Sequence, residues 1–229
     1  MGRKSNKVGV VITAGGRGVR LGGLIPKQFL LLKGKSILRR SLEAFDSISV
    51  VGEIIVVVPE DQLRRTENII VQSKFGKIVH VVVGGIERQH SVRNGLLSFD
   101  VEPEIVLVHD AVRPLVTADV IKRVIREAKK HGAAVVGVRV KDTIKLEVDG
   151  FYKKTLDRKN LWAVQTPQGF RYEILKKAHL AAQRSAFLGT DEASLVERLR
   201  IPVKIVEGNY QNIKITTEDD LKLSKLILK

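Results

Sequence analysis

Glycines and basic residues follow the first apolar segment of the chain at a spacing that suits phosphate binding. The segment Lys7–Ala14 leads into GGRGVR at positions 15–20, and PKQ follows at 26–28. Glycines directly after a strand let backbone N–H groups approach phosphate oxygens closely. Arg20 and Lys27 are cations that could clamp a triphosphate and stabilise its transition state. The same residues also suit a glycine-rich connector with solvated cations, so this motif alone leaves both interpretations open.

The spacing of the glycines excludes two common phosphate motifs. A dinucleotide-binding fingerprint needs a third glycine three residues after Gly18, and position 21 is leucine. The segment Gly34-Lys35-Ser36 resembles the end of a P-loop, but Phe29 stands where that motif requires its first glycine. A phosphate site in this chain must therefore be of another kind.

Strands and helices alternate along the first 138 residues. Apolar β-branched runs predict strands, and apolar residues at helical spacing predict helices, such as one capped by Ser36 and running to Phe45. Apolar strands separated by helices predict an α/β fold with a mostly parallel sheet covered on both faces. Ligands of such sheets bind at the carboxyl ends of the strands, so we expect functional loops after Ala14, Val83 and Val108. The predicted strands are Lys7–Ala14, Glu53–Val58, Lys77–Val83, Glu104–Val108 and Ala133–Val138, and the other predicted helices are Asp61–Gln72, Ser91–Ser98 and Thr117–His131.

A polar hairpin interrupts this alternation. Residues 140–156 read as two strands joined by Asp149-Gly150, a strong hairpin signal. The hairpin is too polar for the core, so we expect one domain over residues 1–229 with a projecting arm at about 139–158. After the arm, we predict strands at Trp162–Gln165, Val203–Val206 and Ile213–Ile215, and helices at Tyr172–Gln183, at Asp191–Leu199 and from Glu218 onward.

Composition narrows the possible environments and partners. The chain has no cysteine, which excludes disulfides and thiolate chemistry and favours a cytoplasmic location. No apolar run approaches the ~18 residues of a membrane span, so we expect no membrane association. The net charge of +15 suits a solvated lysine-rich surface, small anionic substrates or nucleic acid. Aromatic residues make up 5% of the chain and do not interleave with basic runs, so we expect no nucleic-acid partner.

Several segments together resemble one enzyme family. Residues 11–38, VITAGGRGVRLGGLIPKQFLLLKGKSIL, resemble the opening signature of the 2-C-methyl-D-erythritol 4-phosphate cytidylyltransferases, which make an isoprenoid precursor. GGIERQHSVRNGL (84–96), VHDAVRP (108–114), DRKNLWAVQTPQGF (157–170), TDEASLVE (190–197) and NIKIT (212–216) match the same family in the same order. The resemblance implies a single Rossmann-like nucleotidyltransferase domain and a homodimer built through the arm. It also implies CTP and methylerythritol phosphate as substrates, with Mg²⁺ bound mainly through their phosphates.

The resemblance implies roles for individual residues. Arg20, Lys27 and Lys214 are the implied catalytic cations. The implied nucleotide-binding residues are Ala14, Gly15, Gly16, Gly18, Gly85, Arg88, Ser91 and Asp110. The implied acceptor-binding residues are Arg113, Thr143, Arg158 and Thr166, of which Thr143 and Arg158 would reach the partner subunit's site. The sequence departs from the family at Gly15, where alanine is common, and at Val112, where alanine is frequent.

The implied reaction needs no catalytic base. A substrate phosphate oxygen, already ionised near neutral pH, attacks the α-phosphorus of CTP, so positioning and charge neutralisation suffice. Asp110 could orient the sugar, hold a magnesium-bound water or cap a turn. We expect His109 to be a hydrogen-bonding residue and Ser91 to cap a helix. We interpret Asp191 and Glu192 as acids at a helix start.

Two other functions remain open from sequence. Ribitol 5-phosphate cytidylyltransferases are similar, although RQHSV at 88–92 and DRKNLW at 157–162 look more like the methylerythritol enzymes. A basic nucleic-acid-binding protein would explain the net charge but not the ordered glycine and cation motifs.

Overall fold

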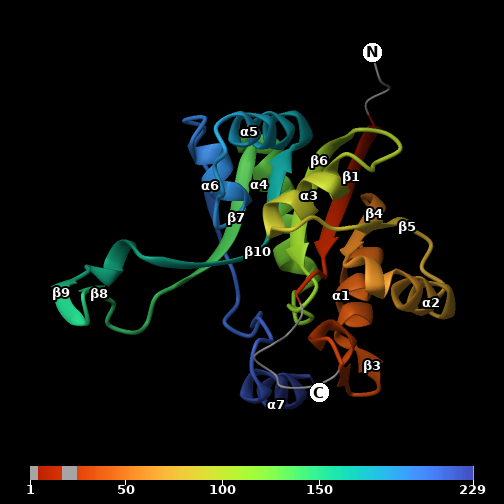
Figure 1. Cartoon of the computed structure of the whole chain (residues 1–229), viewed down its shortest axis with the longest axis horizontal. Helices are drawn as coiled ribbons and strands as arrows, with labels where there is room; N and C mark the ends of the chain where they lie inside the picture. The colour runs from red at the N-terminus through yellow and green to blue at the C-terminus, as the bar shows by residue number, and fades with distance from the viewer. Residues whose placement is uncertain (1–4, 17–24, 229) are drawn as a thin grey trace.

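A seven-stranded sheet forms the centre of the computed structural model, which describes residues 5–16 and 25–228. The strand order is β11-β7-β10-β6-β1-β4-β5, and β10 is the strand that runs antiparallel to its neighbours β6 and β7. This arrangement confirms the predicted mostly parallel sheet (Figure 1). The strands are β1 (Ser5–Thr13), β4 (Val51–Val58), β5 (Ile78–Val83), β6 (Pro103–Asp110), β7 (Ala133–Arg139), β10 (Trp162–Arg171) and β11 (Lys204–Glu207).

Helices cover both faces of the sheet, as the apolar strands predict. Side chains alternate along a strand, so Val10 and Ile12 of β1 enter one core cluster and Val11 enters the other. The first cluster packs against α1 (Ile37–Asp46), α2 (Leu63–Ser73) and α4 (Ala118–His131). The second cluster packs against α3 (Arg88–Leu96), α5 (Tyr172–Arg184) and α6 (Glu192–Glu197).

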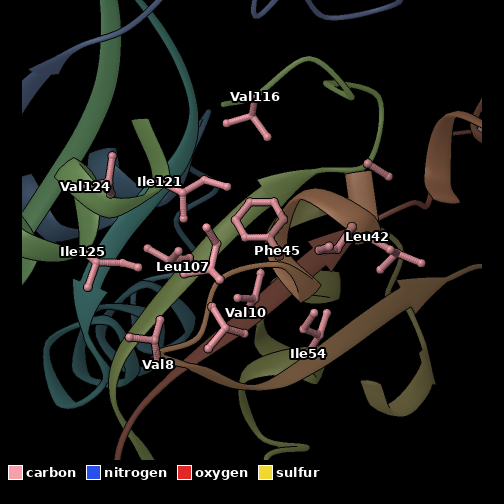
Figure 2. Packing of buried hydrophobic residues seen from close by; sticks show 14 of the residues in the cluster. Val8, Val10, Leu42, Phe45, Ile54, Leu107, Val116, Ile121, Val124 and Ile125 are labelled. Carbon is pink, nitrogen blue, oxygen red and sulfur yellow. The ribbon is translucent and has the colours of Figure 1, made fainter. Parts of the chain in front are cut away.

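The larger core cluster joins α1 and α4 to the middle of the sheet. Phe45 of α1 is fully buried among side chains that include Leu107 of β6 and Ile121 of α4 (Figure 2). Truncating such a buried aromatic residue typically costs ~3–5 kcal/mol, so this cluster fixes the strands whose ends carry the site. The predicted cap at Ser36 is confirmed, because its side chain accepts a hydrogen bond from the N–H of Arg39, and Thr117 caps α4 by accepting one from the N–H of Val120.

The arm is a separate two-stranded ribbon of β8 (Lys145–Val148) and β9 (Phe151–Thr155). Asp149 has φ 51° and Gly150 has φ 82°, the positive values that a two-residue hairpin turn of type I′ requires. Every residue of both strands is exposed, and Figure 1 shows the ribbon extending away from the sheet. The hairpin predicted from Asp149-Gly150 is therefore confirmed.

The structure differs from the sequence expectation in three places. Ile213–Ile215 is not a strand; Ile215 is buried beside Leu32 and Ile37, and this packing explains the apolar pattern. The strand predicted at Trp162–Gln165 continues to Arg171. A small ribbon of β2 (Leu31–Leu32) and β3 (Lys35–Ser36) was not predicted, whereas the final helix α7 (Glu218–Ile227) was.

Candidate active site

A cleft of about 570 Å³ lies where β1, β5 and β6 end. Its walls are residues 13–16, 27–28, 59–60 and 83–88, together with Ser91, Asp110, Val112 and Lys214. Strand β1 pairs with β4 on one side and with β6 on the other, so the order in which the chain adds strands to the sheet changes direction next to β1. Open α/β sheets bind ligands at such a switch point. The functional loops predicted after Ala14, Val83 and Val108 therefore meet in one cleft.

The glycine turn and Lys27 form one side of the cleft. The N–H of Ala14 donates to Val57, and the buried amide of Gln28 donates to the carbonyl of Ala14 at 2.8 Å. The side chain of Lys27 lies beside the turn: a methyl group built onto Gly16 would be 3.3 Å from Cε of Lys27. The backbone N–H groups of the glycine turn and the ammonium group of Lys27 therefore lie side by side, an arrangement that suits phosphate binding. Two residues of the predicted phosphate site, Gly18 and Arg20, lie outside the described residues.

The loop after β5 forms a second wall through close backbone contacts. The Oγ of Ser91 accepts a hydrogen bond from the N–H of Gly85 at 3.0 Å and donates one to the carbonyl of Glu87. A Cβ on Gly84 would lie 2.7 Å from that Oγ, and a Cβ on Gly85 would lie 2.4 Å from Cβ of His90, so both positions require glycine. The prediction that Ser91 caps a helix is wrong, since α3 begins at Arg88 and Glu87 is its N-cap.

Asp110 is a buried carboxylate at the floor of the cleft and gathers three cations. Its Oδ2 lies 2.8 Å from Nζ of Lys214 and 3.8 Å from Nε of Arg113, and its Oδ1 lies 3.3 Å from Nη2 of Arg88. Burial disfavours the charge on Asp110, but Arg88, Lys214 and Arg113 outweigh burial and hold the pKa of this carboxyl well below its usual range. Asp110 is therefore ionised whenever the protein is folded near neutral pH.

A second buried carboxylate contacts the same arginine. Glu192, at the start of α6, is 1% exposed, and its oxygens lie 2.8 and 2.7 Å from Nη1 of Arg88. Burial raises the pKa of Glu192, and the Arg88 guanidinium opposes that rise. Sequence reasoning missed this contact: it interpreted Glu192 as a first-turn acid, and the partner is 104 residues away.

His109, Thr166 and Arg113 support Asp110 from beneath. The Oγ1 of Thr166 accepts the N–H of Asp110 at 3.1 Å and lies 3.0 Å from Nδ1 of His109, and Nη1 of Arg113 donates to the carbonyl of Asn212. Burial lowers the pKa of His109 to about 4, so this side chain is neutral near pH 7. His109 is fully buried and satisfied on both ring nitrogens, as expected of a residue that is not a catalytic base.

The two arm residues of the predicted site do not join the cleft within this chain. Thr143 and Arg158 are exposed and absent from its walls, and Nη1 of Arg158 donates to the carbonyl of Lys141. Among the described residues, no helix is both long and apolar enough to cross a bilayer.

Known proteins resemble the chain over nearly its whole length. Residues 8–229 match the family described as IspD, 2-C-methyl-D-erythritol 4-phosphate cytidylyltransferase. An enzyme of that name from Caldanaerobacter subterraneus subsp. tengcongensis is 47% identical, over 97% of this chain and 99% of the relative. Another from Geobacillus kaustophilus is 44% identical over 95% of both.

Solved structures agree with these sequence matches. The Francisella tularensis 2-C-methyl-D-erythritol 4-phosphate cytidylyltransferase superposes with a TM-score of 0.82 at 35% identity, covering 97% of this chain and 100% of that one. The 4-diphosphocytidyl-2C-methyl-D-erythritol synthase of Anaerococcus prevotii gives a TM-score of 0.86 at 29% identity, covering 97% of this chain and 98% of that one.

The Rossmann-like sheet and the glycine- and cation-lined cleft at its switch point define a nucleotidyltransferase. The full-length matches narrow this class further, since the family match over residues 8–229 includes part or all of every strand of the sheet and every segment of the cleft. The chain belongs to the 2-C-methyl-D-erythritol 4-phosphate cytidylyltransferase family.

Proposed function

We propose that the enzyme transfers the cytidylyl group of CTP to 2-C-methyl-D-erythritol 4-phosphate, giving 4-diphosphocytidyl-2-C-methylerythritol and pyrophosphate in the non-mevalonate isoprenoid pathway. One observation carries this proposal. The family-like segments at 11–38, 84–96 and 108–114, which are far apart in sequence, supply most of the walls of one cleft, and NIKIT at 212–216 contributes Lys214 to it. A cytoplasmic location, expected from the cysteine-free sequence, belongs to the same proposal.

The charges of the cleft suggest how CTP lies in it. The triphosphate lies along Gly15 and Gly16 beside Lys27, where backbone N–H groups and a cation adjoin. The cytosine lies against the loop from Gly85 to Ser91, where the arginine charge is neutralised by carboxylates. The acceptor phosphate then approaches from the side of Lys214, with Arg113 and Thr166 holding Asp110 in place.

The chemistry follows from charge placement. An oxygen of the acceptor phosphate attacks the α-phosphorus in line, the bond to the β-phosphate breaks, and pyrophosphate leaves. Lys27, Lys214 and Arg20 stabilise negative charge on the crowded phosphorus and the leaving group. No side chain needs to remove a proton, which agrees with the neutral, buried state of His109.

The cleft suits Mg²⁺ held mainly by the substrates. Mg²⁺ keeps several waters and uses one or two carboxylates plus substrate phosphates. Asp110 is the buried carboxylate of the cleft, whereas Glu53, His80 and Asp100, the described residues that cluster as three candidate ligands, lie toward the opposite ends of the strands. When bound, the ion would neutralise triphosphate charge, and Asp110 would orient one of its waters.

We also propose that the arm builds a homodimer. Phe151 and Tyr152 are each 79% exposed, and within residues 5–16 and 25–228 no third strand or helix covers the two-stranded ribbon. An isolated hairpin is only marginally stable in water. A second subunit would cover these rings and receive Thr143 and Arg158 at its own cleft.

Pyrophosphate release tests the proposed reaction. The enzyme is mixed with Mg²⁺, each of the four nucleoside triphosphates, and either methylerythritol 4-phosphate or ribitol 5-phosphate. We expect release with CTP and the methylerythritol substrate; equal rates with UTP or ATP would exclude the cytidylyl assignment, and preference for ribitol 5-phosphate would change the acceptor. Tight, salt-sensitive binding of duplex DNA or RNA would instead favour the nucleic-acid alternative.

A further inference from the structure

The first residues of helices α3 and α6 form an ion pair beside the cleft, between the half-buried Arg88 and the buried Glu192. We infer that Glu192 is a positioning residue for nucleotide recognition: it fixes the guanidinium of Arg88 and cancels its charge, so that Arg88 acts as an oriented hydrogen-bond donor to the base and not as a phosphate-binding cation. This inference rests on the proposed function, because it assigns a role to one wall of the proposed CTP site.

The donor pattern of Arg88 supports this role. Nη1 donates to both oxygens of Glu192, and Nε and Nη2 donate to Oδ1 of Asp110 at 3.3 Å each. A guanidinium has five N–H groups, so these four bonds leave at least one N–H for a ligand. The side chain is 32% exposed and lines the cleft, so that donor can reach a bound molecule.

The charges around Arg88 make it a poor phosphate ligand. Glu192, at 1% exposure, faces this guanidinium, and Asp110, at 6% exposure, also faces it while contacting Lys214 and Arg113. A triphosphate brought to Arg88 would meet those negative charges in a poorly solvated site, where repulsion is strong. Lys27 lies beside the glycine turn, where backbone N–H groups add to its positive charge. Phosphate is therefore favoured at Lys27, and a neutral base at Arg88.

Glu192 is itself held firmly in position. Asp191 caps α6 by accepting the N–H of Ser194 and also accepts a hydrogen bond from the amide of Gln168 at 2.6 Å. The same Gln168 accepts the N–H of Ala193, so β10 fixes the start of α6 on both sides of Glu192. A side chain whose backbone is anchored in this way selects one geometry for its partner, which is what an orienting residue requires.

The helix that carries Arg88 is tied to the same region. Gln89, the next residue, donates to the carbonyl of Phe187 at 3.0 Å and accepts the N–H of Gly189 at 2.8 Å. Both partners lie in the connection between α5 and α6. The Arg88–Glu192 pair is therefore the cleft-side member of a set of contacts that joins α3 to α6.

Steady-state kinetics of Glu192→Gln, Arg88→Lys and the double variant test this inference, with Glu197→Gln as the matched control. Glu197 is an exposed acid on the same helix, outside the cleft. KM for CTP and kcat are measured at saturating acceptor, and CTP affinity is measured by calorimetry without acceptor. We expect Glu192→Gln to raise KM and Kd for CTP by about 10- to 100-fold, the loss of one charged hydrogen bond, with kcat within a few-fold of wild type. The CTP-to-UTP preference should fall as well.

The double-mutant cycle of these variants distinguishes a positioning role of Glu192 from a general role in stability. Arg88→Lys should share the CTP defect, and combining the two changes should add little, because both act through one contact. Unchanged KM and Kd in Glu192→Gln would overturn the inference, as would a loss confined to kcat, which would place Arg88 at the reacting phosphates. If Glu192→Gln does not fold, Arg88→Lys decides: a wild-type CTP Kd overturns the inference. A wild-type enzyme that releases no pyrophosphate would instead refute the proposed function.

Discussion

Replacing Lys27 by alanine should slow turnover by about 10²- to 10³-fold without unfolding the enzyme, the scale seen when one preorganised donor to the transition state is lost. Lys27 opens a short 3-10 helix after Pro26, and its side chain lies against Gly16. The next two residues, Gln28 and Phe29, are 1% and 4% exposed and anchor this segment. Truncation of Lys27 therefore removes charge from the cleft and leaves these buried contacts intact. The expected loss corresponds to about 2.7–4 kcal/mol of activation free energy.

Lys35→Ala is the control for this prediction. Lys35 lies in the segment that resembles a P-loop, and its Nζ lies 2.8 and 2.9 Å from the two oxygens of Glu43. The pair is partly exposed, at 41% and 31%, so its removal should cost about 0–1 kcal/mol of stability. Turnover of this variant should stay within a few-fold of wild type.

The assay is pyrophosphate release at saturating CTP and acceptor, with circular dichroism and thermal melting of each variant. Arg20→Ala should resemble Lys27→Ala, and the double variant should lose less than the sum because both cations act on one phosphate cluster. An inactive Lys35→Ala beside an active Lys27→Ala would refute the reasoning and move the phosphate site to residues 34–36.

Three further predictions concern packing, pH and assembly. Gly95→Ala should destabilise the enzyme by about 1–3 kcal/mol in urea unfolding, although alanine normally favours a helix. The added methyl group would lie 2.7 Å from Cγ1 of Val11 and 2.8 Å from Cγ2 of Val57. Equal or higher stability of the variant would contradict this prediction. Burial, aided by nearby positive charge, lowers the pKa of His179 from 6.5 to about 4, so the unfolded chain binds more protons between these values and stability should fall as pH drops through them. His179→Leu should reduce this acid-induced loss of stability by at most about 3 kcal/mol. If stability depends on pH in the variant as it does in wild type, His179 is not a neutral buried group in the folded state. Phe151→Ser should weaken self-association in analytical ultracentrifugation without changing the circular dichroism spectrum, whereas an unchanged dimer dissociation constant would exclude this ring from the interface.

Local patterns in the sequence predicted the framework well. Each strand predicted in the first 138 residues is a strand of the sheet, because burial on both faces of a parallel sheet leaves a clear signature. The caps at Ser36 and Thr117 and the turn at Asp149-Gly150 depend on neighbouring residues alone, so they too could be read directly.

Long-range contacts account for what could not be predicted. Glu192 looks like an ordinary acid at a helix start, and only the fold brings it to Arg88. Ser91 has the residue type of a helix cap, but its hydroxyl is used to hold Gly85, and α3 begins three residues earlier. Ile215 is apolar because α7 and the β2–β3 ribbon pack around it, not because it lies in a strand.

A crystal structure of the enzyme with CTP and Mg²⁺ tests the central claim most directly, which is that the cleft after β1, β5 and β6 binds this nucleotide. The account predicts triphosphate density along Gly15 and Gly16 within contact of Lys27, and cytosine against the loop from Gly85 to Ser91 with a hydrogen bond from Arg88. Cytosine stacked elsewhere, or a triphosphate bound at Gly34-Lys35-Ser36, would contradict the account.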